Sequence, residues 1–353
     1  MAVSIPCLCT REDVKRATDI KETARNNWQI DRAIQGATRN IEGHLHRKFY
    51  PVDTTNYFDW PNFDYAYPWR LWLNQYQLAA TPTAVTTGGT QIPLSACNFE
   101  PINSGPPYSY LELRRDLPYS FGVGPTPQRD VAITGTFGYW LETDPGGTLA
   151  AAVSSTTATA VTVTDSSLVG VGQMLIVGAE RMVVTGRAMA DTGQTNLSGA
   201  TTAMLNDQTI GVTDGTQLHV DEVIQIDSER MLIVDITGNS VTVKREWDGT
   251  TLADHSTGAR IYALRALTVL RGQNGTAAST YNSGTAVAVW QIPQLARDLA
   301  IAEASQRAIQ EVGGYSDPQG DGEGASHGLG TALADLWDEV ETVYGRKARI
   351  RGI

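Results

Sequence analysis

The sequence predicts an α+β fold, in which a helical core with a small antiparallel sheet is interrupted by an inserted all-β domain, a small barrel or sandwich. Helical periodicity is confined to the two ends of the chain. Between Thr148 and Trp290 the composition changes to Val, Thr, Gly and Ala in short alternating runs, which are typical of strands. This region also contains an internal repeat. We therefore expect a discontinuous core formed by residues 1–147 and 291–353, and an inserted β domain formed by residues 148–290.

The N-terminal segment predicts two helices. Thr10 begins the first, with Asp13 three residues later in an arrangement similar to a capping box, and the helix extends to about Asn26. The second helix has one apolar face, because its apolar residues recur at steps of three and four, and Pro51 follows its end. The residues of this face are Ile30, Ile34, Ala37, Ile41 and Leu45.

An aromatic-rich segment follows, with nine aromatic residues between Tyr57 and Tyr76. Flat rings suit the faces of sugars, so a glycan-stacking platform is one interpretation. The interleaved Pro, Asn and Asp favour instead an irregular strand-and-turn segment whose rings pack on a neighbouring surface. Aromatic residues are also enriched at subunit contacts, so packing or an interface is the favoured interpretation.

Further strands are predicted before the inserted domain. Gly88-Gly89 indicates a hairpin turn, and strands are expected in the segments SYLELRR and RDVAITGTFGYW. The turn-forming residues Asp144–Gly147 then separate these strands from the β domain.

The helical pattern returns after the β domain. Pro293 lies near the first turn of a helix that ends at Gly313-Gly314, and a last helix begins at Thr331. Residues 313–330, between these helices, predict a flexible Gly-rich linker. The expected apolar faces consist of Leu295, Leu299, Ala302, Ile309 and Val312 in the first helix and of Leu333, Leu336, Val340 and Val343 in the second.

The inserted region repeats itself at two offsets. The Glu-Arg-Met triplet at residues 180–182 returns 49 residues later at 229–231, and residues 243–261 parallel residues 269–287 at an offset of 26. Along the chain, the first half of the repeated module occurs twice before its second half occurs twice. We therefore predict that one copy of the module is nested inside the other. The Asp-Gly and Asn-Gly pairs at matching places predict turns with positive φ. The repeated Glu and Arg predict cross-strand pairs or solvent exposure rather than a site.

Charge and cysteine content limit the function classes. The net charge is −11, whereas a protein that grips phosphates normally has a basic surplus, so specific nucleic-acid binding is disfavoured. Three cysteines without framework spacing fit a reducing compartment. A zinc site formed by Cys7 and Cys9 with His44 and His46 is disfavoured, because the histidines would lie on different helix faces. No membrane segment is expected.

The sequence contains no recognisable catalytic, cofactor-binding or metal-binding motif. Gly-x-Ser-x-Gly, His-Glu-x-x-His and Walker sequences are absent. Asp191–Gly193 is the triplet of aspartic proteases, but its polar flank favours a turn. The five histidines have no acidic or nucleophilic partner apparent in the sequence. We therefore expect a protein that is not an enzyme and that needs no cofactor.

Several stretches together resemble the head-to-tail connector (adaptor) proteins of long-tailed bacteriophages. The opening helix pair, from TREDVKRATDI to IDRAIQGATRNIEGHLHRKFYP, is similar to the N-terminal helices of that family, and residues 83–116 are similar to its central strands. VAITGTFGYW, followed after the insert by IPQLARDLAIAEASQRAI, resembles its Gly-Tyr turn and Pro-started helix. The repeat is similar to a small β module of phage structural proteins. It departs from that module at Glu246, where the other copy has Gly272.

The resemblance implies a structural virion protein with a helical adaptor core. Such a protein forms a dodecameric ring between the portal and a stopper or tail-completion protein and extends the DNA channel used in genome packaging and ejection. DNA would pass through the lumen without specific binding. The protein would be assembled in the host cytoplasm and would reside in the head-tail neck of the virion. The β insert would decorate the ring or contact capsid or tail.

The C-terminal tail is the predicted segment for binding the portal or a neighbouring ring, because tethered tails can become ordered on binding. A frayed, solvated terminus is the alternative. An alternative function for the whole chain is a β-rich virion or cell-surface binding module, including a glycan-binding one. The predicted anchors of the tail are Arg346, Lys347, Arg349, Ile350, Arg351 and Ile353.

Overall fold

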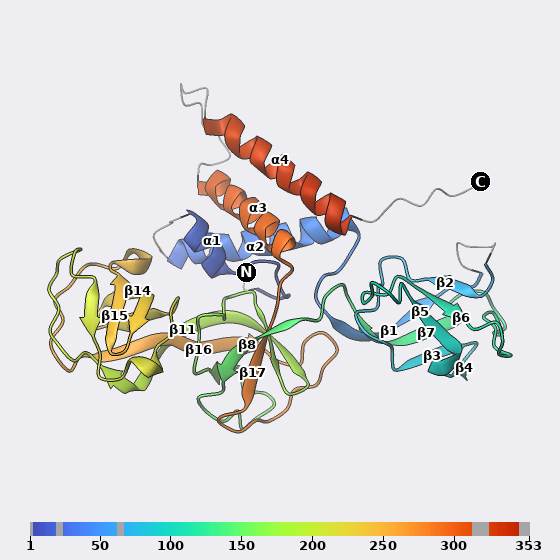
Figure 1. Ribbon diagram of the computed structural model, residues 1–353, viewed down its shortest axis with the longest axis horizontal. Helices are drawn as coiled ribbons and strands as arrows, with labels where there is room; N and C mark the ends of the chain where they lie inside the picture. The colour runs from blue at the N-terminus through green and yellow to red at the C-terminus, as the bar shows by residue number, and fades with distance from the viewer. Residues whose placement is uncertain (1–2, 19–23, 62–66, 313–324, 346–353) are drawn as a thin grey trace.

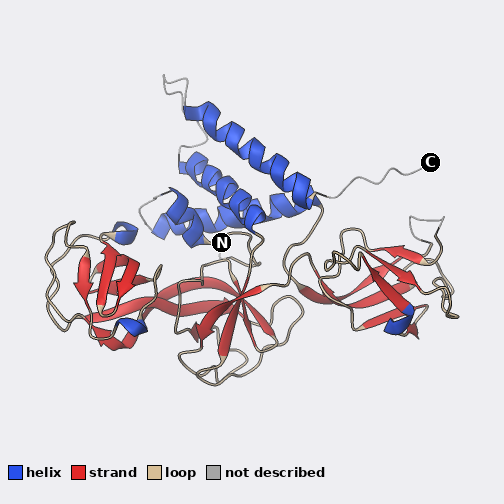
Figure 2. Cartoon of the chain, viewed as in Figure 1, coloured by secondary structure: helices blue, strands red, loops and turns tan. Residues whose placement is uncertain are grey.

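The structure, a computed structural model, describes residues 3–18, 24–61, 67–312 and 325–345. These residues form seventeen strands and four α-helices. The helices lie together on one side of the molecule, above a row of three β units (Figure 1). The four α-helices are segregated from the strands, although they come from both ends of the chain, and only short 3-10 helices lie within the β units (Figure 2). We call the β units terminal (residues 52–137), host (143–187 and 266–290) and nested (188–265).

The expected fold class, a helical core with a small sheet, is wrong. The largest sheet of the described residues has ten strands and runs through the host and nested units. Buried residues of the helices and of the host unit form one continuous apolar cluster. Backbone hydrogen bonds from Cys7 to Gly172 (2.9 Å) and from Arg11 to Val171 (3.0 Å) fix this contact. The amphipathic helices therefore bury part of their apolar surface against the β structure rather than against one another alone.

The two N-terminal helices largely follow the expectation. α1 (Arg11–Thr18) begins with a reciprocal capping box, in which the Thr10 amide donates to Asp13 (2.9 Å) and the Asp13 amide donates to Thr10 Oγ1 (3.1 Å). α2 (Ala24–Leu45) includes Asn26, which was expected at the end of the first helix. The predicted apolar face of α2 is confirmed, since each of its residues is buried: Ile30, Ile34, Ala37, Ile41 and Leu45.

The predicted apolar face of α3 (Gln294–Val312) is partly wrong. Leu299 is buried, but Ile309 is 53% exposed. The buried side of α3 consists mainly of alanines, whose small side chains let α3 lie close to α2. Asn40 Nδ2 of α2 donates to Glu303 Oε1 of α3 at 2.9 Å across this contact. The buried alanines are Ala296, Ala300, Ala304 and Ala308.

The last helix, α4 (Ala325–Tyr344), begins earlier than the expected Thr331. It packs on α3 and buries Val340, whereas Val343, expected on the same face, is 52% exposed. Residues 325–330, expected in the linker, are therefore helical, and the remainder of that linker lies outside the described residues.

The terminal β unit has a core of its own. Its four-stranded sheet has the order β1 (Val52–Phe58), β7 (Val131–Phe137), β3 (Ala84–Thr87) and β4 (Thr90–Ile92). Its three-stranded sheet has the order β2 (Arg70–Trp72), β6 (Tyr110–Leu113) and β5 (Cys97–Glu100). The predicted hairpin turn is confirmed, because Gly88 and Gly89 join β3 to β4 with φ of 53° and 81°.

The host and nested units have equivalent strand orders. The host unit pairs β9 (Ala160–Thr162), β16 (Arg260–Leu270), β11 (Glu180–Asn196), β10 (Met174–Val177) and β17 (Ala286–Trp290) in that order. The nested unit pairs β12 (Thr209–Gly211), β15 (Ser240–Lys244), β14 (Glu229–Thr237), β13 (Val223–Ile226) and β16.

The strand register of the two units is also equivalent. Leu175 is opposite Val289 in the host unit, and Ile224 is opposite Ala263 in the nested unit. These pairs are related by the offsets of 49 and 26 that the sequence shows. The predicted nesting of one copy inside the other is confirmed.

Two strands connect the nested unit to the host unit. β11 has 17 residues and pairs with β16 from Val183 opposite Leu270 to Asn196 opposite Arg260. The pairing is antiparallel and contains three register shifts. The host unit contains residues 180–187 of β11 and 266–270 of β16, and the nested unit contains residues 188–196 and 260–265 of the same strands. The two units are therefore joined by a two-stranded ribbon rather than by a flexible linker.

The turn expected at Asp144–Gly147 is wrong, because these residues lie within β8 (Thr143–Thr148). β8 is at the edge of the ten-stranded sheet and pairs there with β17. Pro145 is tolerated at this edge because a strand with one neighbour does not need every backbone N–H as a donor.

Candidate functional site

The predicted tail site lies outside the described residues. Arg346, Lys347, Arg349, Ile350, Arg351 and Ile353 all follow Gly345, the last residue that the structure describes. The candidate sites within the described residues are a pair of buried charge clusters, a cleft below the helices and an aromatic surface of the terminal unit.

The first charge cluster is buried in the nested unit. Arg245 donates from Nε and Nη2 to the two carboxylate oxygens of Glu229, both at 2.7 Å, and neither side chain is exposed. His255 Nε2 lies 3.0 Å from Glu229 Oε2, and the amides of Glu246 and Ala253 also donate to this carboxylate. Burial alone would raise the pKa of Glu229, but these hydrogen bonds lower it to about 2.

The host unit contains the equivalent cluster. Arg271 donates to both carboxylate oxygens of Glu180, at 2.7 and 2.8 Å, and the amides of Gly272 and Ser279 donate to it as well. Tyr281 lies at the position equivalent to His255. Burial would raise the pKa of Glu180, but hydrogen bonds led by that from Arg271 lower it. The repeated Glu is therefore a buried partner of Arg, and solvent exposure is the wrong interpretation for it.

The turns of the two copies hold the units to their neighbours. Positive φ is confirmed at Asn274 (54°) and Asp248 (56°). The Asn274 carbonyl accepts from the Asp53 amide of β1 at 2.9 Å, and Arg181 lies 2.9 Å from the Asp53 carboxylate. Asp248 lies 3.7 Å from Lys15 of α1. The sequence indicated only the turn geometry, because these partners are distant along the chain.

A cleft of about 570 Å³ lies between the helices and the host unit. Most of its charged groups pair with one another, between α1 and α3 and from α1 to the β units. This internal pairing favours a structural junction over a ligand pocket, because a bound ion would have to displace an existing partner. The pairs are Arg297 with Asp13 (2.7 Å), Arg187 with Glu12 (3.4 Å) and Arg16 with Asp221 (3.7 Å).

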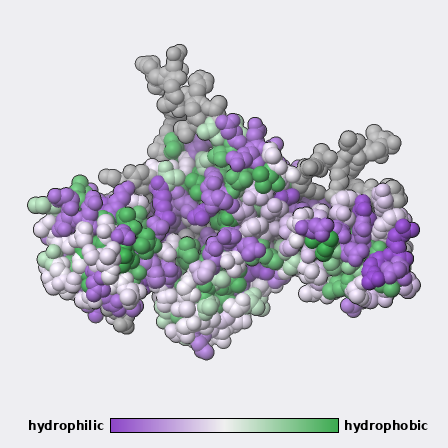
Figure 3. Space-filling model, in the orientation of Figure 1, coloured by the Kyte–Doolittle hydropathy of each residue, from purple (hydrophilic) through white to green (hydrophobic). Residues whose placement is uncertain are grey.

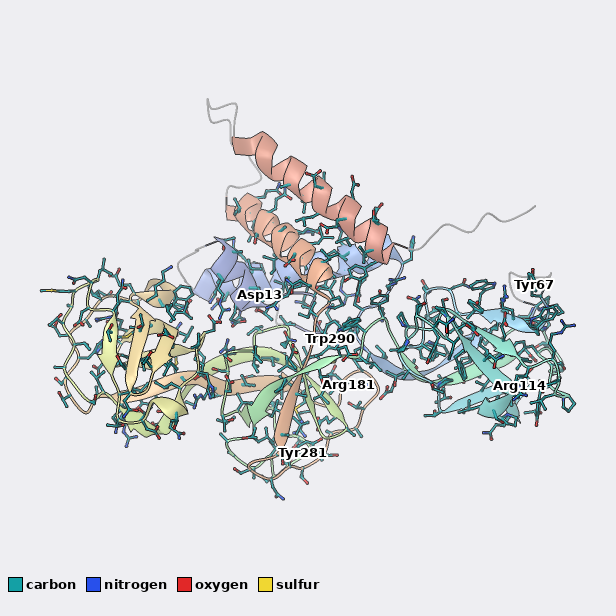
Figure 4. The ribbon with its side chains drawn as sticks, in the orientation of Figure 1. Asp13, Tyr67, Arg114, Arg181, Tyr281 and Trp290 are labelled. Atoms are coloured by element: carbon teal, nitrogen blue, oxygen red, sulfur yellow. The ribbon has the colours of Figure 1, made fainter. Side chains whose placement is uncertain are left out.

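The aromatic-rich segment forms a surface of the terminal unit that we call the aromatic–arginine cluster: Tyr67, Trp69, Arg70, Trp72, Tyr110 and Arg115. Tyr67, which is 43% exposed, lies at the outer end of this unit (Figure 4). The Arg70 guanidinium lies 4.6 to 5.6 Å from the ring centres of Tyr67, Trp72 and Tyr110, and that of Arg115 lies 4.4 Å from the ring centre of Trp69.

The geometry of this cluster favours a protein interface. Trp72 and Tyr110 are tilted by 53° with ring centres 4.5 Å apart, so they present no common plane to a sugar. Guanidinium groups also cover ring faces that a sugar would need. Trp, Tyr and Arg are the residues enriched at the energetic centres of protein interfaces.

Three histidines have acidic partners that the sequence did not reveal. His44 pairs with Glu341, His219 with Asp165 at 3.5 Å and His255 with Asp227 at 2.8 Å. These partners are 28 to 297 residues away, so local sequence contains no signal for them. The turn expected at Asp191–Gly193 is wrong, because the triplet lies within β11, where Asp191 pairs with Arg260.

Within the described ranges, no group of three or more His, Cys, Asp or Glu side chains could hold a metal ion. None of the helices described has the length and apolar character needed to cross a membrane. Cys7, Cys9 and Cys97 are buried, and burial raises the pKa of Cys7 to about 12 and that of Cys97 to about 11.

Comparison with known proteins gives no relative: no family model, no curated protein and no solved structure matches the chain.

Proposed function

We propose that this protein is a head-to-tail adaptor of a long-tailed bacteriophage, which forms a ring between the portal and the stopper or tail-completion protein. One observation carries the proposal. The two segments that resemble adaptor helices, at the N-terminus and at residues 292–309, are brought together as α2 and α3. Asn40 and Glu303, which are hydrogen-bonded across this contact, are 263 residues apart in the chain.

The polar interactions are consistent with a mechanical role. The buried Glu–Arg pairs connect strands and the cleft pair Arg297–Asp13 connects two helices, so these carboxylates and guanidiniums already have partners inside the molecule. A ring that experiences force during packaging and ejection needs firmly joined units. Closed rings also obtain stability from many identical contacts, each of which can be modest.

The charge of the chain suits a channel component. With a net charge of −11, the protein does not have the basic surplus that sequence-independent binding to phosphates requires. A lumen with this character lets DNA pass without retaining it. We propose accordingly a dodecameric ring in the head-tail neck, assembled in the host cytoplasm, with the β units at its periphery.

The test is association with the portal. The purified full chain is mixed with the portal rings encoded beside it, and the mixture is examined by sedimentation velocity and electron microscopy. We expect faster sedimentation and an additional ring at the narrow end of the portal. A chain ending at Gly345 is the matched control, and it should bind the portal more weakly because it lacks the six predicted anchors.

Absence of association by the folded full chain would refute the adaptor function. Trimers with affinity for glycans would then support the alternative, a β-rich binding module of the virion or cell surface.

A further inference from the structure

The two copies of the β module differ in one loop. In the host unit, residues 150–159 lead into β9, and in the nested unit residues 198–208 lead into the equivalent strand β12. Each loop contains an equivalent bridge, in which Val153 pairs with Tyr281 and Thr201 pairs with His255. The nested loop is one residue longer, because the offset between the copies rises from 48 at these bridges to 49 at the strands.

The frame of both loops is the same. Arg271 Nη1 donates to the carbonyls of Ser155 (3.1 Å) and Ala158 (3.0 Å) in the host unit. Arg245 Nη1 donates to the carbonyls of Thr202 and Asp207, both at 3.1 Å, in the nested unit. Each arginine is held by its buried carboxylate, so both loops are fixed from the inside.

The tips of the loops have opposite character. Met204 and Leu205 are each 58% exposed in the nested unit, whereas the host unit has Ser155 and Thr156 at the matching places. The Met204 carbonyl accepts from the Asp207 amide (3.0 Å), and the Asp254 carboxylate accepts from the Ala203 amide, so the tip is held by these hydrogen bonds as well. A fixed loop that presents two adjacent large apolar side chains to solvent is suited to contact with a partner.

A complementary surface exists at the other end of the same chain. The nested unit and the terminal unit lie at opposite ends of the row of β units, and the loop between β11 and β12 is on the outer edge of the nested unit (Figure 1). Apolar side chains are visible on the surfaces of both end units (Figure 3). The aromatic–arginine cluster belongs to the terminal unit, where Tyr67 occupies the outer end (Figure 4).

The chemistry of the two surfaces also matches. Thioether sulfur makes favourable contacts with aromatic rings, so Met204 suits the ring edges of Tyr67 and Trp69. The loop carries the carboxylate of Asp207, and the carboxylate of Asp254, from the segment between β15 and β16, lies beside it and accepts from the Ala203 amide. On the other side, Arg115 lies over Trp69 and forms no ion pair with a described residue.

We infer that the Met204–Leu205 loop of one copy docks on the aromatic–arginine cluster of a second copy of this chain. The contact is head to tail, since it joins two different surfaces, and repetition of such a contact closes a ring when the rotation permits. In the ring this contact lies at the periphery, and this part of the inference rests on the proposed ring assembly.

Cysteine cross-linking tests the contact directly. Leu205→Cys and Arg115→Cys are prepared as separate full-length variants, mixed, and treated with a short bis-maleimide. The three native cysteines are buried, so the reaction reports the introduced thiols. We expect cross-linked dimers from the mixture and none from either variant alone, and a ladder of oligomers from the double variant. Thr156→Cys mixed with Arg115→Cys is the matched control and should give no dimer.

A second measurement replaces the apolar tip of the nested loop with the polar tip of the host loop. Met204→Ser combined with Leu205→Thr gives the nested loop the tip of its host equivalent. We expect the self-association constant, measured by sedimentation equilibrium, to fall by about tenfold or more. The conservative double variant Met204→Leu, Leu205→Met should retain it.

Several outcomes would overturn the inference. Dimers from Leu205→Cys alone would indicate a symmetric contact, and assembled rings without the mixed cross-link would exclude these surfaces. If the mixed cross-link forms but the portal is not bound, this inference stands and the adaptor function fails. If the portal carries an extra ring without the cross-link, the adaptor function stands and this inference fails. A chain that never self-associates, alone or on the portal, refutes both.

Discussion

Removal of one buried carboxylate should loosen the nested unit alone. Glu229→Gln is the perturbation, because it keeps the shape of the side chain and removes its charge. Arg245 would then be buried without a counter-ion, with neither side chain exposed to solvent. Breaking a buried pair in this way costs about 3–5 kcal/mol, because the remaining charge is desolvated and uncompensated.

The pH dependence gives an independent magnitude. The pKa of Glu229 is lowered from 4.5 to about 2 in the folded protein. A difference of one in pKa corresponds to about 1.36 kcal/mol, so the charged state of Glu229 stabilises the nested unit by roughly 3 kcal/mol. Because the folded-state pKa is the lower one, this contribution is complete above about pH 4.5 and is lost as the pH falls towards 2. Both routes give the same order of magnitude.

Hydrogen exchange followed by mass spectrometry is the suitable assay, because it reports each unit separately. Peptides from β13 and β14 monitor the nested unit, and peptides from β10 monitor the host unit. At neutral pH we expect Glu229→Gln to reduce protection in the nested unit by about two to four orders of magnitude, with a much smaller change in β10. Asp235→Asn is the matched control, since it removes the same charge from an exposed position on the same strand.

Two results would refute the reasoning. One is a change below about tenfold in the nested unit, which would mean that the pair contributes little. The other is an equal loss in both units, which would mean that they unfold together. The double variant Glu229→Leu, Arg245→Met provides a further check, because replacement of both partners should restore part of the protection that either single variant loses.

Three further predictions concern other parts of the chain. Gly275→Ala should lower the melting temperature more than Gly284→Ala. Both positions have positive φ, but only a Cβ at Gly275 would meet the Asp53 carbonyl oxygen, at 1.8 Å. Equal effects of the two substitutions would contradict this contact. Burial raises the pKa of Glu42 to about 7, so the folded state favours its protonated form and is destabilised as pH rises from about 4.5 to 7. Glu42→Gln should therefore stabilise the protein at pH 8 by up to about 3 kcal/mol and have little effect at pH 4.5. If melting curves show the same stability difference between variant and wild type at both pH values, the raised pKa of Glu42 is excluded. At pH 8 the folded protein should react slowly with a thiol reagent and the unfolded protein rapidly, and fast reaction of the folded state would disagree with the burial of Cys7, Cys9 and Cys97.

The duplication was predictable because it leaves a direct record in the sequence. Glu180 and Glu229 lie in identical triplets, and the offset of 26 pairs Arg271 with Arg245. These four residues turned out to form the two buried ion pairs. Their burial was not predictable, because an adjacent Glu and Arg on an isolated strand look the same whether a strand is covered or exposed.

The fold class was not predictable from periodicity for a related reason. The pattern of α2 identifies an apolar face, but it does not say what covers that face. In the folded chain Ile34 lies beside Gly172 of the host unit, 138 positions further along the sequence. Similarly, the spacing of Ile309 predicted a core residue, but in the structure Ile309 is exposed and the alanines of α3 are buried instead. Such choices depend on tertiary contacts that no local pattern records.

The nested arrangement also sets an order in which the protein can form as it leaves the ribosome. The nested unit is one continuous segment, residues 188–265, and can fold as soon as it has emerged. The host unit cannot be completed until β17 has been synthesised, because the nested unit separates its two halves in the chain. The helices wait longest, because α2 acquires its partner α3 only after about 250 residues of further synthesis. Until the host unit and α3 have both formed, the apolar face of α2 is incompletely covered. A subunit therefore cannot present a complete helical surface to its neighbours before its own translation is nearly finished.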